Sequence, residues 1–194
     1  MTDGSDGGMH LEAGDSTFIR ARRADIHPVI AAVAEWGRWW PGVTTAARAD
    51  GSASVVLRAP RAPRRLPPHA RRIEVRVLKD RRDLGVDLAY GGDLRGTAEW
   101  YYLDERDGTV VHYLLHAQAG HRGWRAALRD HRASVRAALT DLKDRFEAQR
   151  YPGDEPDPRL LADQRDAVAA FQAGVEAYAR KVAAQRATAG SEVL

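Results

Sequence analysis

The sequence predicts an α+β fold in which an antiparallel sheet of about seven strands packs against a long helix. Three patterns lead to this fold class. Apolar and charged residues alternate along 73–79, as on a half-buried strand. Residues 96–103 and 109–117 are rich in Val and Tyr and flank a turn with Gly108, which predicts a hairpin. In 120–146 the apolar spacing changes to three and four, which predicts an amphipathic helix.

Shorter signals predict the other elements. Asp25 precedes Pro28 at a helix start, where the missing N–H of proline costs little. The prolines of 59–68 take that segment out of the sheet, because proline cannot donate to a central ladder. The further predicted strands are 11–20, 43–48, 54–58 and 84–90.

Composition along the chain predicts the domain boundaries. Residues 1–10 are mostly Gly, Asp and Ser and are expected to be disordered. Residues 11–148 then form one globular domain, and the proline-rich stretch 149–158 is a linker. An additional amphipathic helix follows at 159–187, with a disordered tail at 188–194.

The additional helix carries an apolar stripe that needs a partner. Its stripe is either packed on the surface of the globular domain or paired with a second copy of the chain, and both alternatives stay open. Apolar residues recur every seven positions, with two aromatic residues between them: Leu161, Val168, Val175 and Val182, then Phe171 and Tyr178.

Overall composition is that of an ordinary globular protein, with 44% hydrophobic and 29% charged residues in 194. The chain has no cysteine, which excludes disulfides, thiolate zinc sites and cysteine nucleophiles. All but three of the 30 basic residues are arginine, which indicates a high-GC bacterial genome. The net charge of +3 is too small to indicate a nucleic-acid partner. Neither a membrane-spanning run nor a signal peptide is recognisable, so we expect a cytoplasmic protein.

Three stretches together resemble a known superfamily. The first is Ser-Thr-Phe-Ile-Arg-Ala at 16–21, which leads into Ala-Asp-Ile-His-Pro-Val-Ile at 24–30. The second is Trp-Gly-Arg-Trp-Trp-Pro-Gly at 36–42, and the third is the hairpin 96–115. Over residues 11–148 the chain resembles the START/Bet v1-like (SRPBCC) superfamily, in particular its bacterial polyketide cyclase/dehydrase branch.

The resemblance implies a helix-grip fold, in which a curved antiparallel sheet wraps around the long C-terminal helix of the domain. It also implies a cavity for an apolar ligand between sheet and helix. Known activities in the superfamily include polyketide cyclisation, lipid or hormone binding and co-chaperone roles, so the fold alone does not give the function.

The period-two alternation predicts which side chains face that interior. If Leu103 pairs with Val110 across the turn, Trp100 lies opposite Tyr113. The predicted inward set is Val75, Val77, Val86, Leu88, Tyr90, Trp100, Tyr102, Val111, Tyr113 and Leu115. The predicted ligand-binding set is Trp39, Val86, Leu88, Tyr90, Trp100, Tyr102, Val111, Tyr113, Leu115, Leu128, His131 and Val135, with His131 and Tyr113 as catalytic candidates.

Each of these residues also has a purely structural interpretation, because a buried Tyr or His is often an ordinary core residue with a satisfied polar atom. Other chemistry is excluded more firmly. His112 and His116 lie ~13 Å apart on a strand, too far to share a metal ion. The run from Asp130 through His131 to Ser134 lies on one helix without a nucleophile elbow. The Arg-rich segment 58–82 is expected to be a solvated loop, although an anionic partner is an alternative.

The sequence therefore leads to three hypotheses. The first is binding of an apolar molecule (polyketide-like, aromatic or lipid) in an internal cavity, with no cofactor, metal or nucleic acid. The second is a polyketide cyclase or dehydratase in the same cavity, with His131 or a Tyr moving protons. The third is an interaction module that uses the 159–187 helix, including a homodimer.

Overall fold

The computed structural model describes residues 9–58, 70–119, 124–148, 150–151 and 153–191. The chain forms two compact units, residues 1–155 and 156–194, which we treat separately. The predictions of disorder for residues 1–8 and 192–194, and the proline-rich part of the Arg-rich segment at 59–69, lie outside the described residues.

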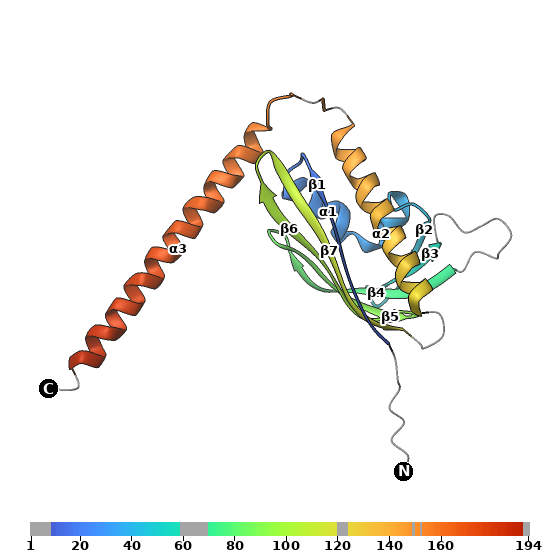
Figure 1. Cartoon of the computed structure of the whole chain (residues 1–194), viewed down its shortest axis with the longest axis horizontal. Helices are drawn as coiled ribbons and strands as arrows, with labels where there is room; N and C mark the ends of the chain where they lie inside the picture. The colour runs from blue at the N-terminus through green and yellow to red at the C-terminus, as the bar shows by residue number, and fades with distance from the viewer. Residues whose placement is uncertain (1–8, 59–69, 120–123, 149, 152, 192–194) are drawn as a thin grey trace, which may run out of the picture. The chain divides into compact units, whose positions relative to one another are not determined.

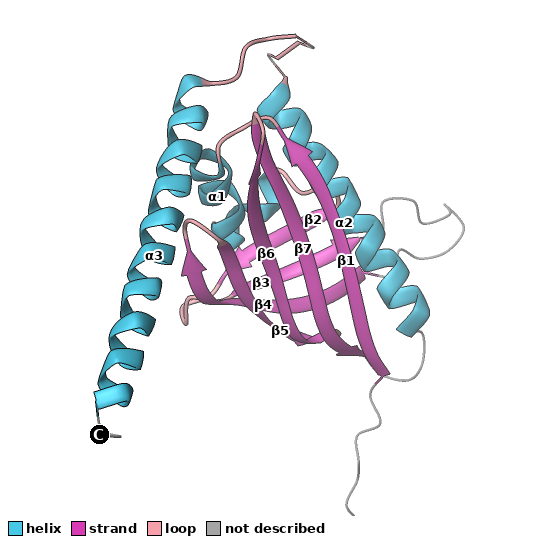
Figure 2. Ribbon diagram, turned by 60° about the vertical axis from the view of Figure 1, so that its left-hand side comes forward, coloured by secondary structure: helices cyan, strands magenta, loops and turns pink. Residues whose placement is uncertain are grey.

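The first unit is built on one antiparallel sheet of seven strands (Figures 1 and 2). The spatial order is β1-β7-β6-β5-β4-β3-β2, so each strand after β1 pairs with its neighbour in sequence and β7 closes back on β1. This confirms the predicted fold class. The strands are β1 (Met9–Ile19), β2 (Val43–Ala47), β3 (Ala53–Arg58), β4 (Ala70–Arg81), β5 (Gly85–Gly92), β6 (Arg95–Glu105) and β7 (Gly108–Ala119).

Helical elements of the first unit share one core with the sheet. Helix α1 (Arg23–Ala31) and the 3-10 helix η1 (Val33–Arg38) connect β1 to β2, and α2 (Trp124–Glu147) follows β7. Ile26 and Ile30 of α1 are fully buried, as are Val135 and Leu142 of α2, and all four join the core formed by the sheet. Helix α2 packs mainly on β1, the strand at one edge of the sheet.

The hairpin of β6 and β7 has the predicted register. Leu103 pairs with Val110, and Trp100 pairs with Tyr113. Gly96, the second residue of β6, has a φ of 148°, a backbone conformation that favours glycine, and a Cβ there would collide with the His116 carbonyl oxygen on β7. The glycine therefore permits the close approach of the two strands.

Some details differ from the sequence-based expectation. Val77 was expected to face inward, yet its side chain is 37% exposed. Val77 pairs with the buried Leu88 and so shares its face, but it is the last residue before a β-bulge between Val77 and Lys79, which a strict period of two cannot anticipate. Strand β1 already begins at Met9, and helix α3 (Pro158–Ser191) extends through residues that we expected to be a disordered tail.

Candidate functional site

A chain of hydrogen bonds connects three buried polar residues from three elements. Tyr90 of β5 and Tyr113 of β7 share a hydrogen bond of 3.1 Å between their hydroxyl oxygens. The Tyr113 hydroxyl lies 2.7 Å from Nε2 of His131 on α2. The period of two brings both tyrosines to the inner face of the sheet, and the period of the helix brings His131 to the face that covers it. All three residues belong to the predicted site.

Burial keeps these three hydrogen-bonded side chains uncharged. The pKa of His131 is lowered to about 4, first by burial and then by the positive charge of Arg71, while Asp15 acts in the opposite direction. Burial likewise raises the pKa of Tyr90 and that of Tyr113 well above the ordinary value for tyrosine. At neutral pH the site therefore contains a neutral imidazole and two neutral phenols.

Among these three hydrogen-bonded side chains, one polar atom has no hydrogen-bond partner. The Nδ1 atom of His131 is buried and makes no hydrogen bond. If Tyr113 donates to Nε2, Nδ1 carries the proton and is an unused donor; if His131 donates from Nε2, Nδ1 is an unused acceptor. A buried polar group without a partner costs about 1–3 kcal/mol, and a ligand group or water that reaches it would recover that cost.

Two charged residues flank the polar chain, and we did not predict either. Asp15 on β1 is paired in register with Tyr113, and its carboxylate accepts hydrogen bonds from Arg132 and Arg136 of α2. Arg71 on β4 continues the alternation that points Ile73 inward, and its Nε is buried without a hydrogen-bond partner. Counting two positions back from Ile73 would have found Arg71.

Tryptophans occupy the interior beside the polar chain. Trp100 packs edge-on against Tyr113, with ring centroids 4.9 Å apart, and also contacts Trp36 and Trp40. Trp40 donates a hydrogen bond from Nε1 to Ser134 on α2, at 2.8 Å from the hydroxyl oxygen. This tryptophan group fixes α2 over the sheet and fills part of the space that the resemblance assigns to a cavity.

Tyr102 lies apart from the polar chain, although we expected it to share the site. Its ring packs edge-on against His27 of α1 at 5.9 Å, and its buried hydroxyl has no partner. His27 in turn is 2.8 Å from the Asp80 carboxylate, where a surface pocket of about 430 Å³ opens. The structure thus divides the predicted tyrosines between two places.

The other predicted ligand-binding residues lie in the core of the first unit. Leu128 is only partly buried, and it lies one helical turn before His131. The fully or almost fully buried ones are Trp39, Val86, Leu88, Val111, Leu115 and Val135.

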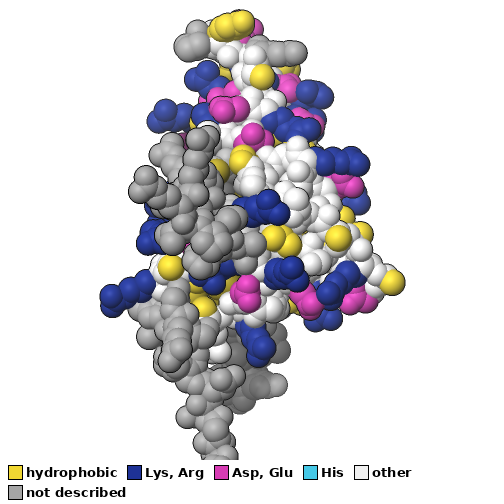
Figure 3. All heavy atoms as spheres, turned by 90° about the vertical axis from the view of Figure 1, so that its right-hand side faces the viewer, with side chains coloured by type: hydrophobic (Ala, Val, Ile, Leu, Met, Phe, Trp, Pro, Cys, Tyr) yellow, Lys and Arg dark blue, Asp and Glu magenta, His cyan; other side chains and the backbone are white. Residues whose placement is uncertain are grey.

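The described residues can be checked for a metal site, a membrane-spanning helix and a basic surface patch. None of the groups of His, Asp and Glu that they form is suited to hold a metal ion, and no helix among them combines the length and apolarity needed to cross a membrane. On the face drawn in Figure 3, the described Lys and Arg side chains are spread among Asp and Glu side chains and form no continuous basic patch.

Of the comparisons with known proteins, the one with solved structures bears on the fold. No protein-family model matches the chain, and no curated protein matches its sequence. The di-domain ARO/CYC BexL from the BE-7585A biosynthetic pathway matches with a TM-score of 0.51 and 17% identity, over 72% of this chain and 51% of BexL. This chain therefore spans about half the length of that protein.

Two other solved structures match over almost their whole length. A START superfamily protein from Mycobacterium smegmatis has a TM-score of 0.52 at 11% identity, over 72% of this chain and 99% of that protein. Ara h 8.0201 has a TM-score of 0.54 at 7% identity, over 73% of this chain and 100% of that protein. These identities are low, so the likeness concerns the fold. Together with the seven-stranded sheet and the covering helix, it shows that residues of the first unit have the START/Bet v1-like helix-grip fold.

Proposed function

We propose that the chain binds an apolar small molecule between the sheet and α2, with the polar group of the ligand at His131. The observation that carries this proposal is the buried Nδ1 of His131, which ends a hydrogen-bonded chain without a partner of its own. Native proteins pair nearly all buried polar atoms, and a polar group of a ligand would supply the partner that Nδ1 lacks.

The surroundings of His131 fit such a ligand. Leu128 and Val135 lie one turn before and one turn after it on α2, and Trp100 packs on its partner Tyr113. Small-molecule sites typically combine apolar and aromatic walls with a few polar groups that orient the ligand. The polar chain would supply that orientation. Likeness to a START superfamily protein and to an ARO/CYC supports the same reading of the fold.

Catalysis as a cyclase or dehydratase in the same site is the second candidate. The contact of 2.7 Å between Tyr113 and His131 gives it a possible proton path. A histidine with a pKa of about 4 is a weak base at neutral pH, and a buried tyrosine with a raised pKa is a weak acid. These directions favour binding and positioning over general acid–base catalysis by this pair.

The binding proposal is tested with the neutral fluorescent probe N-phenyl-1-naphthylamine. Leu128→Trp adds bulk one turn from His131 and should weaken binding at least about tenfold, because it competes for the ligand's space. Leu103→Trp, at a position on the hairpin that is 44% exposed, is the matched control and should leave the affinity unchanged. Equal affinities for both variants, or no saturable binding by the parent protein, would overturn the proposal.

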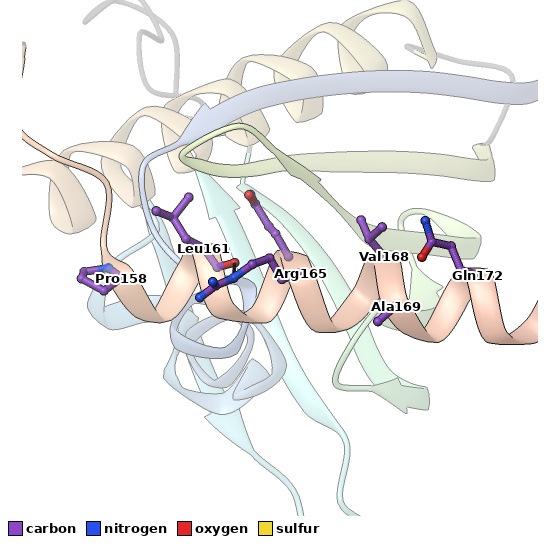
Figure 4. Close-up of a pocket in the computed structure, with 7 residues that line it drawn as sticks. Pro158, Leu161, Arg165, Val168, Ala169 and Gln172 are labelled. Carbon is purple, nitrogen blue, oxygen red and sulfur yellow. Dashed lines mark hydrogen bonds between the residues drawn. The ribbon is translucent and has the colours of Figure 1, made fainter.

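We also propose that α3 pairs with α3 of a second copy of this chain. The heptad stripe predicted from the sequence is exposed on the second unit: Leu161, Val168, Phe171, Val175 and Tyr178 are between 41% and 73% exposed. Figure 4 shows Leu161, Arg165, Val168 and Gln172 on successive turns of this helix.

The chemistry of the stripe favours a second copy as the occupant. Val stands at three of the four positions that repeat every seven residues, and the six residues of the stripe carry no charge, so a second copy of the same stripe can pack on it. A stripe of this kind is complementary to itself, as a two-fold symmetric interface requires. Sedimentation should give a dimer that Val168→Glu with Val175→Glu converts to a monomer, whereas Ala173→Glu on the opposite face does not. A monomeric parent protein would contradict the pairing.

A further inference from the structure

We propose that the ligand of this site is an acid: an apolar molecule with a carboxylate or phenolate that pairs with Arg71. This inference rests on the proposed binding function and adds the charge of the ligand to it. It follows from where the sheet places Arg71 and from what Arg71 lacks.

The register of β4 places the Arg71 side chain on the inner face of the sheet. It pairs with Leu57 of β3, whose side chain is 5% exposed, and paired residues share one face of a sheet. The next residues on that face, Ile73 and Val75, are buried core residues. The side chain therefore starts from the inner face, and its Nε lies out of contact with solvent.

Other arginines of the first unit have carboxylate partners, and two of them, Arg81 and Arg132, are partly buried like Arg71. Arg132 and Arg136 share Asp15, and Arg81 contacts both Asp87 and Glu99. Among the described residues, no carboxylate pairs with Arg71, and its Nε makes no hydrogen bond. A partly buried cation without a counter-charge is costly, so an anion brought by a ligand would be favoured there.

The position relative to His131 gives the anion a second contact. On the inner face that carries Arg71, Val75 pairs with Tyr90, and the Tyr90 ring lies 6.1 Å from the His131 ring, so Arg71 and His131 face the same interior. The positive charge of Arg71 also lowers the pKa of His131. A carboxylate can accept a pair of hydrogen bonds from a guanidinium and still present a lone pair to a neighbouring donor. If Nδ1 of His131 carries the proton, this N–H can donate to the ligand carboxylate. The carboxylate then supplies the hydrogen-bond partner that Nδ1 lacks.

Two probes of similar shape separate the charge from the apolar body. 1-Anilinonaphthalene-8-sulfonate carries a sulfonate, and N-phenyl-1-naphthylamine is its neutral relative. The protein should bind the anionic probe at least about tenfold more tightly than the neutral one, as expected for a charge-assisted hydrogen bond in a partly buried site. Arg71→Met should remove that preference and leave the neutral probe unaffected, and Arg71→Lys should retain part of it.

Arg76→Met is the matched control, because Arg76 lies on the same strand but on the exposed face. It should change neither affinity. Folding of Arg71→Met is expected to be unimpaired, since the substitution removes an unpaired charge, and its melting temperature checks this. Equal affinities of the parent protein for the two probes, or an equal loss with Arg76→Met, would overturn the acid proposal while binding itself stands. No saturable binding of either probe would overturn both proposals.

Discussion

The hydroxyl of Tyr113 lies 2.7 Å from Nε2 of His131, and this contact joins the last strand of the sheet to the helix that covers it. Trp40 and Ser134 make a second polar contact to the same helix, with the indole N–H donating over 2.8 Å. Both contacts are buried, so they determine how α2 sits on the sheet as well as the chemistry of the site.

Tyr113→Phe tests how much the contact between Tyr113 and His131 contributes to the stability of the fold. The substitution leaves both ring nitrogens of His131 without a protein partner, so we expect a loss of about 1–3 kcal/mol in the free energy of unfolding. Urea denaturation at neutral pH measures it. Tyr151→Phe, at a residue that is 71% exposed, should change stability by less than about 0.5 kcal/mol. An unchanged stability of Tyr113→Phe would mean that the contact is not maintained in solution.

His131 should make stability depend on pH. Its pKa is about 4 in the folded chain and 6.5 as the ordinary value, so the unfolded chain binds more protons between these pH values. Stability is therefore fully present above pH 6.5 and falls as the pH drops to about 4, by about 3 kcal/mol in total. Urea denaturation across this range measures the slope. His131→Gln should flatten it, and an equal slope in both proteins would contradict a buried neutral imidazole.

Asp15 should make the folding stability depend on pH in a lower range than His131 does. Burial raises its pKa, but the hydrogen bonds from Arg132 and Arg136 outweigh this and leave the pKa below 3.8. The stabilisation is thus present above that value and is lost as the pH falls through the folded pKa. Asp15→Asn should destabilise the chain by about 1–3 kcal/mol at neutral pH, because two arginines lose their shared partner. Asp25→Asn on α1 serves as the control for a carboxylate outside this cluster.

Two glycines should respond in opposite ways to alanine. Gly96→Ala places a Cβ against the His116 carbonyl at a φ of 148°, so we expect a loss of about 1–3 kcal/mol. Gly174→Ala lies in α3 with open space around it and should stabilise that helix by roughly 0.5–1 kcal/mol. Thermal unfolding followed by circular dichroism separates the two. A neutral Gly96→Ala would contradict the close approach of β6 and β7.

Much of the fold could be predicted because it depends on local periodicity. The alternation along β6 and β7, with Gly108 at the turn, was enough to give the register that pairs Trp100 with Tyr113. The bulge after Val77 shows the limit, since it adds one residue to β4 without a local sequence signal. We placed the end of α3 at residue 187, whereas the helix ends at Ser191, because helix ends fray and an apolar period locates an element more sharply than its last residue.

The site could be predicted only in part. Tyr90, Tyr113 and His131 were placed together because each lies on the inward face of its own element. Tyr102 lies on the same face of the sheet, yet it meets His27 of α1, a contact between distant segments that periodicity does not report. Arg71 was overlooked because a charged residue in an alternating strand is ordinarily assigned to solvent.

The most direct test of ligand binding at His131 is its own imidazole signal. Long-range ¹H–¹⁵N NMR spectra should be recorded while N-phenyl-1-naphthylamine is added, with His131→Gln identifying the resonance among the seven histidines. We predict that the His131 nitrogen shifts move in a saturable way, with the same affinity as the probe fluorescence, while those of exposed His116 stay in place. Saturable fluorescence without any change at His131 would show that the probe binds elsewhere and would contradict the proposed site.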